Sequence, residues 1–232
     1  MRTRLTYALL FVLVLALAGT ALAQNDADVV RLTILHTSDE HGWLQPYTPY
    51  GENITQGGAA NVGGWWAEIE AYDPASTIIL SGGDNWTGPS ISTWFYGQPV
   101  VEVFNLLSYD ASAIGNHEFD FGLDEMEARF AEAAYPYLSA NIRDGATGDP
   151  ASFAQPYALL ERQGLTIAVI GLTSTRTPSV THPQNVAGLG FMDYSSALDT
   201  YLPEVEAAGA EVVIILAHAC TSEVSYLARA YN

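Results

Sequence analysis

The sequence contains no lysine, so its positive side chains are eight arginines set against 26 aspartate and glutamate residues. The formal net charge is −18. A surface this acidic repels nucleic acid backbones and anionic lipids, and we expect neither as a partner. The absence of lysine also excludes the Walker loop, which needs a lysine to hold phosphates, and any Schiff-base chemistry.

Cysteine is nearly absent as well, because Cys220 is the only one in the chain. One cysteine cannot form an internal disulfide, so stability must come from an apolar core, and 232 residues are enough to enclose one. We expect Cys220 to be a small buried side chain rather than a nucleophile. A cysteine phosphatase would carry an arginine six positions later, where this sequence has Tyr226.

A long hydrophobic run occurs near the N-terminus, from Leu9 to Leu17. Arg2 and Arg4 precede the run, and the small residues Ala21-Leu22-Ala23 follow it. This order predicts a secretory signal peptide in residues 1–23, cleaved after Ala23. The run is short for a bilayer core of about 30 Å, and no stop-transfer segment follows. We therefore expect an exported protein, periplasmic or extracellular, with no stable membrane anchor after cleavage.

Residues 24–232 alternate short β-branched apolar runs with segments of helical periodicity. The predicted strands are residues 29–35, 77–80, 111–114, 165–170 and 211–216. The predicted helices are residues 62–71, 100–107, 123–133 and 195–207. Residues 157–162 and 165–170 are predicted to form a β-hairpin with its turn at Gln163-Gly164. This alternation predicts an α/β layered domain whose sheet is at least partly parallel.

Residue types that bind metals follow four of the predicted strands. Asp39 and His41 follow the first, Asp84 the second, Asn116 the third and His218 the last. Each of these residues alone is more typical of an ordinary turn. Ligands of open α/β sheets gather beyond the carboxyl ends of the strands, so we expect these side chains to converge. Carboxylate, amide and imidazole groups together form the mixed oxygen and nitrogen set that Zn, Mn or Fe accepts.

Two metal ions are expected rather than one. A carboxylate can bridge two cations about 3.5–4 Å apart, and such a pair clamps the attacking and leaving oxygens of a phosphoryl group. Asp84 is the candidate bridge, since the preceding Gly82-Gly83 allows a close backbone approach. In this hypothesis Asp39 and His41 hold one ion, and Asn116 and His218 hold the other.

Three segments resemble the first motifs of the calcineurin-like metallophosphatases in their secreted 5′-nucleotidase and UDP-sugar hydrolase form. They are residues 35–42 (LHTSDEHG), 81–84 (SGGD) and 113–120 (AIGNHEFD). Residues 138–142 and 167–173 resemble further blocks of that family, so the similarity covers nearly all of residues 24–232. The resemblance implies a layered αββα sandwich. It also implies hydrolysis of nucleotide phosphate esters by a hydroxide activated by two divalent ions, drawn from Zn, Mn, Fe or Co.

The resemblance also implies roles for individual residues. It makes Asp39, His41, Asp84, Asn116 and His218 metal ligands, as the strand-end pattern already suggested. It further places His117 against the substrate phosphate, with Asp120 orienting the ring. A histidine held in one tautomer by a carboxylate can stabilise the developing charge or protonate the leaving alkoxide. We expect Glu40 and Glu118 to be solvated residues or supports for the ligands.

The family pattern continues with Gly-His-x-His and a C-terminal domain that binds the nucleotide, and neither follows here. We therefore expect residues 24–232 to be a catalytic domain truncated before that motif, with a fold incomplete at its C-terminus. Such a fragment should be weakly active or inactive. Two alternatives remain open: the same site acting on a cyclic nucleotide, a nucleotide sugar or a sulfur-linked ester, and a secreted binding module without catalytic activity.

Overall fold

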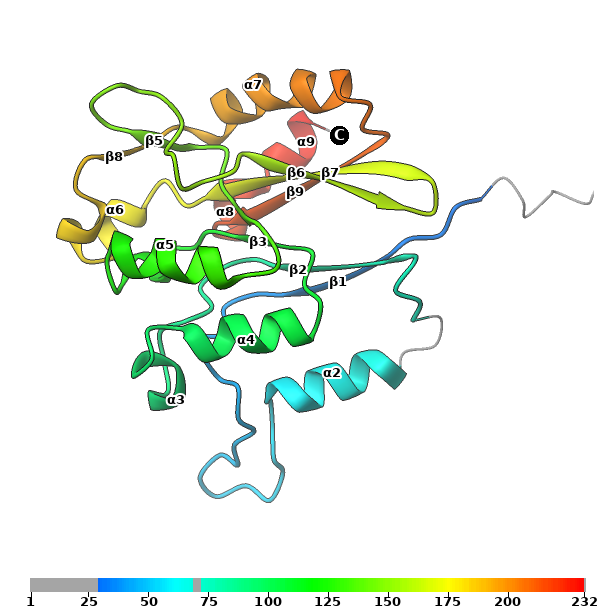
Figure 1. Ribbon diagram of the computed structural model, residues 1–232, viewed down its shortest axis with the longest axis vertical. Helices are drawn as coiled ribbons and strands as arrows, with labels where there is room; N and C mark the ends of the chain where they lie inside the picture. The colour runs from blue at the N-terminus through cyan, green and yellow to red at the C-terminus, as the bar shows by residue number, and fades with distance from the viewer. Residues whose placement is uncertain (1–28, 69–71, 232) are drawn as a thin grey trace, which may run out of the picture. The chain divides into compact units, whose positions relative to one another are not determined.

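The computed structural model describes residues 29–68 and 72–231 (Figure 1). The predicted signal peptide, residues 1–23, lies outside this range. The chain divides into two units, Met1–Arg31 and Leu32–Asn232, and every element below belongs to the second. Among the described residues, no helix has the length and apolar character needed to cross a membrane.

The first sheet is fully parallel and carries most of the predicted site residues at its strand ends. Its strands are β1 (Thr33–Thr37), β2 (Thr77–Ser81), β3 (Ala111–Ala113) and β4 (Tyr137–Leu138), in the order β1-β2-β3-β4. Helices α2 (Ala59–Glu68), α4 (Gln98–Leu106) and α5 (Leu123–Glu132) lie in the connections. Ile79 of β2 packs into the cluster shared with these helices, whereas Ile78 and Leu80 point to the opposite face. This alternation follows from the two-residue period of a strand.

The second sheet combines the predicted hairpin with one parallel strand. β6 (Tyr157–Arg162) pairs with β7 (Leu165–Thr173) antiparallel, and β7 pairs with β9 (Val212–His218) parallel, so the order is β6-β7-β9. Helix α7 (Tyr194–Ala207) crosses between the two parallel strands. Ala168 and Ile170 of β7 pack in the cluster that includes α7, and Ile167 and Val169 pack toward the first sheet.

The two sheets face each other across one apolar layer. It consists of buried side chains from both sheets, namely Ile78, Leu80, Ala111, Ala113, Leu138, Ile167, Val169 and Leu216. Figure 1 shows α7 outside the second sheet, and α4 and α5 outside the first. The predicted αββα sandwich is therefore confirmed. A two-stranded sheet of β5 (Ile142–Asp144) and β8 (Leu189–Phe191) completes the strands of the described residues.

The remaining elements are single turns. They are α3 (Ser90–Thr93), η2 (His117–Phe119), α6 (Thr177–Val180), η3 (Pro183–Val186), α8 (Thr221–Val224) and α9 (Leu227–Ala230). The last two, α8 and α9, follow β9. Cys220 directly precedes α8 and is exposed, so the expectation of a buried cysteine was wrong.

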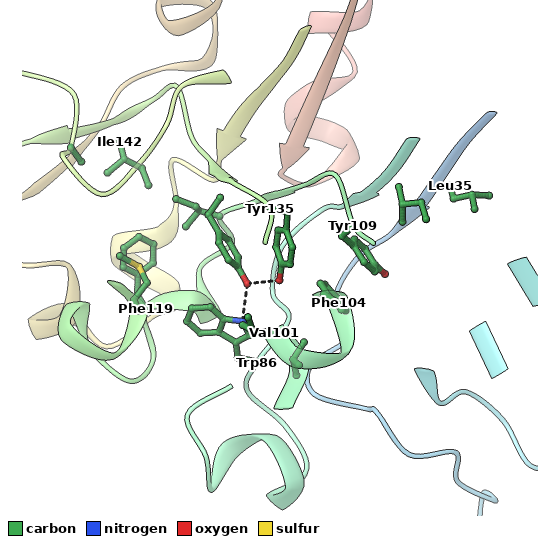
Figure 2. Packing of buried hydrophobic residues seen from close by; sticks show 14 of the residues in the cluster. Leu35, Trp86, Val101, Phe104, Tyr109, Phe119, Tyr135 and Ile142 are labelled. Carbon is green, nitrogen blue, oxygen red and sulfur yellow. Dashed lines mark hydrogen bonds between the residues drawn. The ribbon is translucent and has the colours of Figure 1, made fainter. Parts of the chain in front are cut away.

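A cluster of aromatic rings supports the loop that follows β2. Trp86 is fully buried, and its Nε1 donates a hydrogen bond to the Tyr137 hydroxyl, which lies 3.0 Å from the Tyr135 hydroxyl. Figure 2 shows Trp86 and Tyr135 inside this cluster, with Tyr109 and Phe104 farther along it. The aromatic packing anchors the segment two residues beyond Asp84.

Candidate dinuclear metal centre

The loop after β1 is bound to the loop after β2 through the backbone. The N–H of Asp39 donates to the carbonyl oxygen of Gly83 at 3.0 Å, and the N–H of His41 donates to that of Asp84 at 3.1 Å. β1 and β2 are neighbouring parallel strands, so their carboxyl ends lie at the same sheet edge. These contacts bring Asp39, His41 and Asp84 together despite their separation along the chain.

All three residues have positive φ angles, which are 57° for Asp39, 45° for His41 and 59° for Asp84. This left-handed region is unfavourable for side chains with a Cβ, although aspartate and histidine enter it more often than most. Strained backbone of this kind concentrates where side chains must be aimed at a functional centre. The observation agrees with a ligand role for the three residues.

Asp84 lies at the centre of the cluster and is 4% exposed. Two groups of three side chains could each hold a metal ion, because the potential ligand atoms within each group lie within 4.8 Å of one another. One group is Asp39, Asp84 and His218, and the other is His41, Asp84 and His117. Asp84 belongs to both groups, as a bridging carboxylate would. The grouping differs from the expected division, which paired Asp39 with His41. The bridge and the division of ligands both stay predictions.

His218 and Asn116 complete the cluster from β9 and from the loop after β3. His218 Nε2 lies 3.3 Å from Asp84 Oδ2 and 3.3 Å from Asn116 Oδ1. The other ring nitrogen, Nδ1, donates to the carbonyl oxygen of Gly82 at 2.9 Å. His41 is oriented in the same way, because its Nδ1 donates to the carbonyl oxygen of Thr87 at 2.9 Å. Each ring therefore keeps Nε2 for the centre, the arrangement found in metal-binding histidines.

The acidic and imidazole groups of the cluster shift one another's pKa values. Burial lowers the pKa of His218, but its hydrogen bond to Asp84 and the charge of that carboxylate raise it to about 9. For Asp84 the effects have the opposite sign. Burial raises its pKa, but His218 and the hydrogen bond from the N–H of His117 lower it below the ordinary value. Asp84 and His218 therefore stabilise each other's charged forms, as a carboxylate and an imidazolium in contact do.

His117 and Asp120 form a hydrogen-bonded pair beside the centre. His117 Nδ1 lies 2.6 Å from Asp120 Oδ2, and the ring centroid of His117 lies 5.0 Å from that of His41. Burial lowers the pKa of His117, but the hydrogen bond to Asp120 and the charge of Asp84 raise it above the ordinary value. The pair has the geometry of an oriented histidine that can carry a proton.

Two residues that the sequence did not single out position Asp120. The Thr181 hydroxyl donates to Asp120 Oδ1 at 3.1 Å, and Asn185 Nδ2 donates to the carbonyl oxygens of Phe119 and Asp120. Thr181 and Asn185 lie more than sixty residues further along the chain, so no local spacing pointed to them.

Glu118 is fully buried, so it is not one of the solvated residues that we considered. Its carboxylate accepts three backbone N–H bonds, from Asp84 at 2.9 Å, Asn85 at 2.8 Å and Gly115 at 2.7 Å. Burial and the nearby Asp84 charge raise the pKa of Glu118 to about 7. The Glu118 side chain therefore connects the loop after β2 to the loop after β3 and fixes the backbone at Asp84.

An open cavity of about 510 Å³ borders this cluster. Its lining includes Asp39, Asn116 and His218, and it extends toward α6 and α8. A substrate can therefore reach the cluster from solvent.

The chain is similar to several known proteins. It is 39% identical over 187 residues to a protein named 5′-nucleotidase from Vibrio cholerae, and the match covers 78% of this chain and 33% of that relative. It resembles the crystal structure of a 5′-nucleotidase precursor from Thermus thermophilus with a TM-score of 0.76 and 27% identity, covering 85% of this chain and 39% of that one. The calcineurin-like phosphoesterase YfkN from Bacillus subtilis gives a TM-score of 0.71 and 26% identity, over 81% of this chain and 61% of that one.

The chain spans about a third of the length of the curated relatives that it matches. No family model matches it.

Proposed function

This chain belongs to the 5′-nucleotidase branch of the calcineurin-like metallophosphatases, and from that premise we propose that its site hydrolyses phosphate esters of nucleotides. The observation that carries the proposal is the position of Asp84, which is common to two groups of potential metal ligands beside an open cavity.

The donor set fits two divalent ions of the Zn, Mn, Fe or Co type. Asp39, His41, Asp84, Asn116 and His218 offer carboxylate, amide and imidazole groups, which these metals accept together. When bound, two such ions polarise a phosphoryl group and acidify a water molecule. Asp84 would help to hold both metal ions, and the other four side chains would supply the remaining ligands.

His117 supplies the proton chemistry in this proposal. Asp120 holds Nδ1, so Nε2 remains for the substrate. The raised pKa of His117 favours the protonated ring, which can donate to a phosphoryl oxygen or protonate the leaving alkoxide. The chain's own contribution is to orient the ester and to hold this proton at Nε2.

We further propose that the protein is exported, with residues 1–23 as its signal peptide, and that its substrates are small nucleotides rather than nucleic acids. The strongly acidic composition supports the second point. In addition, we propose weak activity for these 232 residues alone, since the chain spans only about a third of the length of the curated relatives that it matches.

The test measures hydrolysis of p-nitrophenyl phosphate and of adenosine 5′-monophosphate with Mn²⁺, together with the metal content per chain. We expect activity that requires Mn²⁺, two bound ions, and a loss of about a hundredfold or more in Asp84→Asn, since that residue would hold both ions. Asp149→Asn, in an exposed turn, serves as the matched control. If the chain hydrolyses neither ester and binds no metal, the proposal is refuted.

A further inference from the structure

The cavity beside the metal ligands continues well beyond them. Its lining includes Asp39, Asn116 and His218, and it also includes Arg176, Thr221 and Glu223. Its volume of about 510 Å³ exceeds what one phosphate group between the ligands would fill. Part of a substrate other than the phosphate that is attacked would therefore lie against α6 and α8.

The backbone at Arg176 is held in place directly after β7. The N–H of Arg176 donates to Ser174 Oγ at 3.2 Å, and its carbonyl oxygen accepts the N–H of Ser179 at 2.8 Å. The buried Thr177 hydroxyl donates to the carbonyl oxygen of Ser174 at 2.7 Å. The exposed arginine side chain thus extends from an ordered turn, which reduces the entropy lost when it binds a ligand.

Within residues 29–68 and 72–231, the Arg176 guanidinium makes no hydrogen bond or ion pair. Arg129 and Arg162, by contrast, pair with Glu132 and Asp110. In a chain with a net charge of −18, acidic partners are plentiful. An arginine without one at the wall of the cavity is available for an anionic ligand, and guanidinium binds phosphate through paired N–H donors.

A carboxylate also faces this part of the cavity, and it opposes anion binding. Glu223 Oε2 accepts the N–H of Cys220 at 3.1 Å, so that carboxylate has a partner of its own at the start of α8. Arg176 is the group that can offset its charge. A single additional phosphate is therefore better accommodated here than a large polyanion.

We propose that Arg176 binds a second phosphate of the substrate, adjacent to the one that is hydrolysed, and so favours nucleoside diphosphates and other esters with two linked phosphates over monophosphates. This inference rests on the function proposed above. Arg176 is then a residue that determines specificity, and the metal ligands serve both classes of substrate.

The test compares two anions that the site cannot hydrolyse, inorganic phosphate and methylenediphosphonate, by calorimetric titration at a fixed, saturating free Mn²⁺ concentration. In Arg176→Gln we expect the affinity for methylenediphosphonate to fall about three- to tenfold, the range of a partly solvated charged hydrogen bond. The affinity for phosphate should stay within about twofold, because that anion binds at the ligands. Arg229→Gln is the matched control, since Arg229 is also exposed and lies outside the cavity lining.

Each other outcome is decisive. Equal losses for both anions, or no loss for methylenediphosphonate, overturn the role of Arg176 while leaving the proposed function in place. If the wild-type chain binds neither anion in the presence of Mn²⁺, the proposed function is contradicted, and the inference fails with it.

Discussion

Asp84 keeps its unusual backbone conformation because neighbouring groups hold it from several sides. Its N–H donates to Glu118, its carbonyl oxygen accepts from His41, and its Oδ1 accepts the N–H of His117 at 2.8 Å. Each contact restrains the same residue, so the left-handed φ of 59° is imposed by the surroundings. Among these partners, Glu118 has the largest effect, since one buried carboxylate satisfies three backbone N–H groups.

Replacement of Glu118 by glutamine should therefore destabilise the fold and weaken metal binding. The carboxamide cannot accept all three N–H bonds and brings its own N–H₂ group into the buried site. We expect the free energy of unfolding to fall by about 2–4 kcal/mol, measured by urea denaturation with EDTA present. Mn²⁺ affinity should fall about tenfold or more because Asp84 is no longer fixed.

Glu127→Gln is the control for this substitution, because Glu127 is exposed on α5. It should stay within about 0.5 kcal/mol of the wild type. Wild-type stability and metal affinity in Glu118→Gln would show that the three hydrogen bonds do not hold the loops.

The site residues differed in how far the sequence could predict them. Asp39, Asp84 and His218 were identifiable because metal-ligand types after predicted strands converge in any parallel sheet. For Glu118 the sequence left open a solvated residue or a support for the ligands, since its partners are backbone N–H groups that leave no mark in the residue pattern. The signal that was available is Gly82-Gly83 and Gly115, whose tight turns leave N–H groups in need of an acceptor.

At the scale of single elements, the hydrophobic pattern located strands and helices better than it located their ends. The first strand was predicted at residues 29–35 but spans Thr33–Thr37. Its register is set by pairing with β2, where Thr33 lies opposite Thr77, and Val29 is 65% exposed. Pairing across a sheet is a contact between distant segments, and the local pattern does not contain it.

Helix α7 begins one residue earlier than predicted. The spacing of apolar residues in the sequence did not reveal the N-cap residue that starts it. Asp193 is the N-cap, and its side chain accepts the N–H of Ser196 at 3.0 Å. Hydrogen bonds from the Ser196 hydroxyl and N–H lower the pKa of Asp193. Its stabilising contribution is therefore present above the unfolded pKa of about 3.9 and is lost as the pH falls through the lower folded value.

Substitution of the cap should show this pH dependence. Asp193→Ala is expected to lose about 1 kcal/mol of unfolding free energy at pH 7, and the difference from the wild type should shrink below about pH 4. Asp193→Asn should keep most of the stability, because asparagine caps helices nearly as well. Urea denaturation of the three proteins between pH 7 and pH 3 measures the effect. A difference between alanine variant and wild type that does not change with pH would rule out a charged cap.

At the scale of the whole fold, β7 shows why a layered sandwich could be predicted from sequence. Its residues Ile167 to Thr173 are buried without interruption, since one face packs on the first sheet and the other on α7. A continuous apolar run is typical of a strand covered on both faces. The close approach of the two sheets could not be predicted, because it depends on how β4 crosses β7 in space.

Gly171 marks that approach and provides the last prediction. A Cβ at this position would clash with the carbonyl oxygen of Leu138, and the N–H of Ala140 donates to the Gly171 carbonyl oxygen at 2.7 Å. Gly171→Ala would force the sheets apart, and we expect a loss of about 2–4 kcal/mol in thermal or urea unfolding. Gly64→Ala is the matched control, because Gly64 lies in α2 with open space around it and should gain about 0.5–1 kcal/mol from its helix propensity. If Gly171→Ala is as stable as the wild type, the two sheets do not meet closely at Gly171.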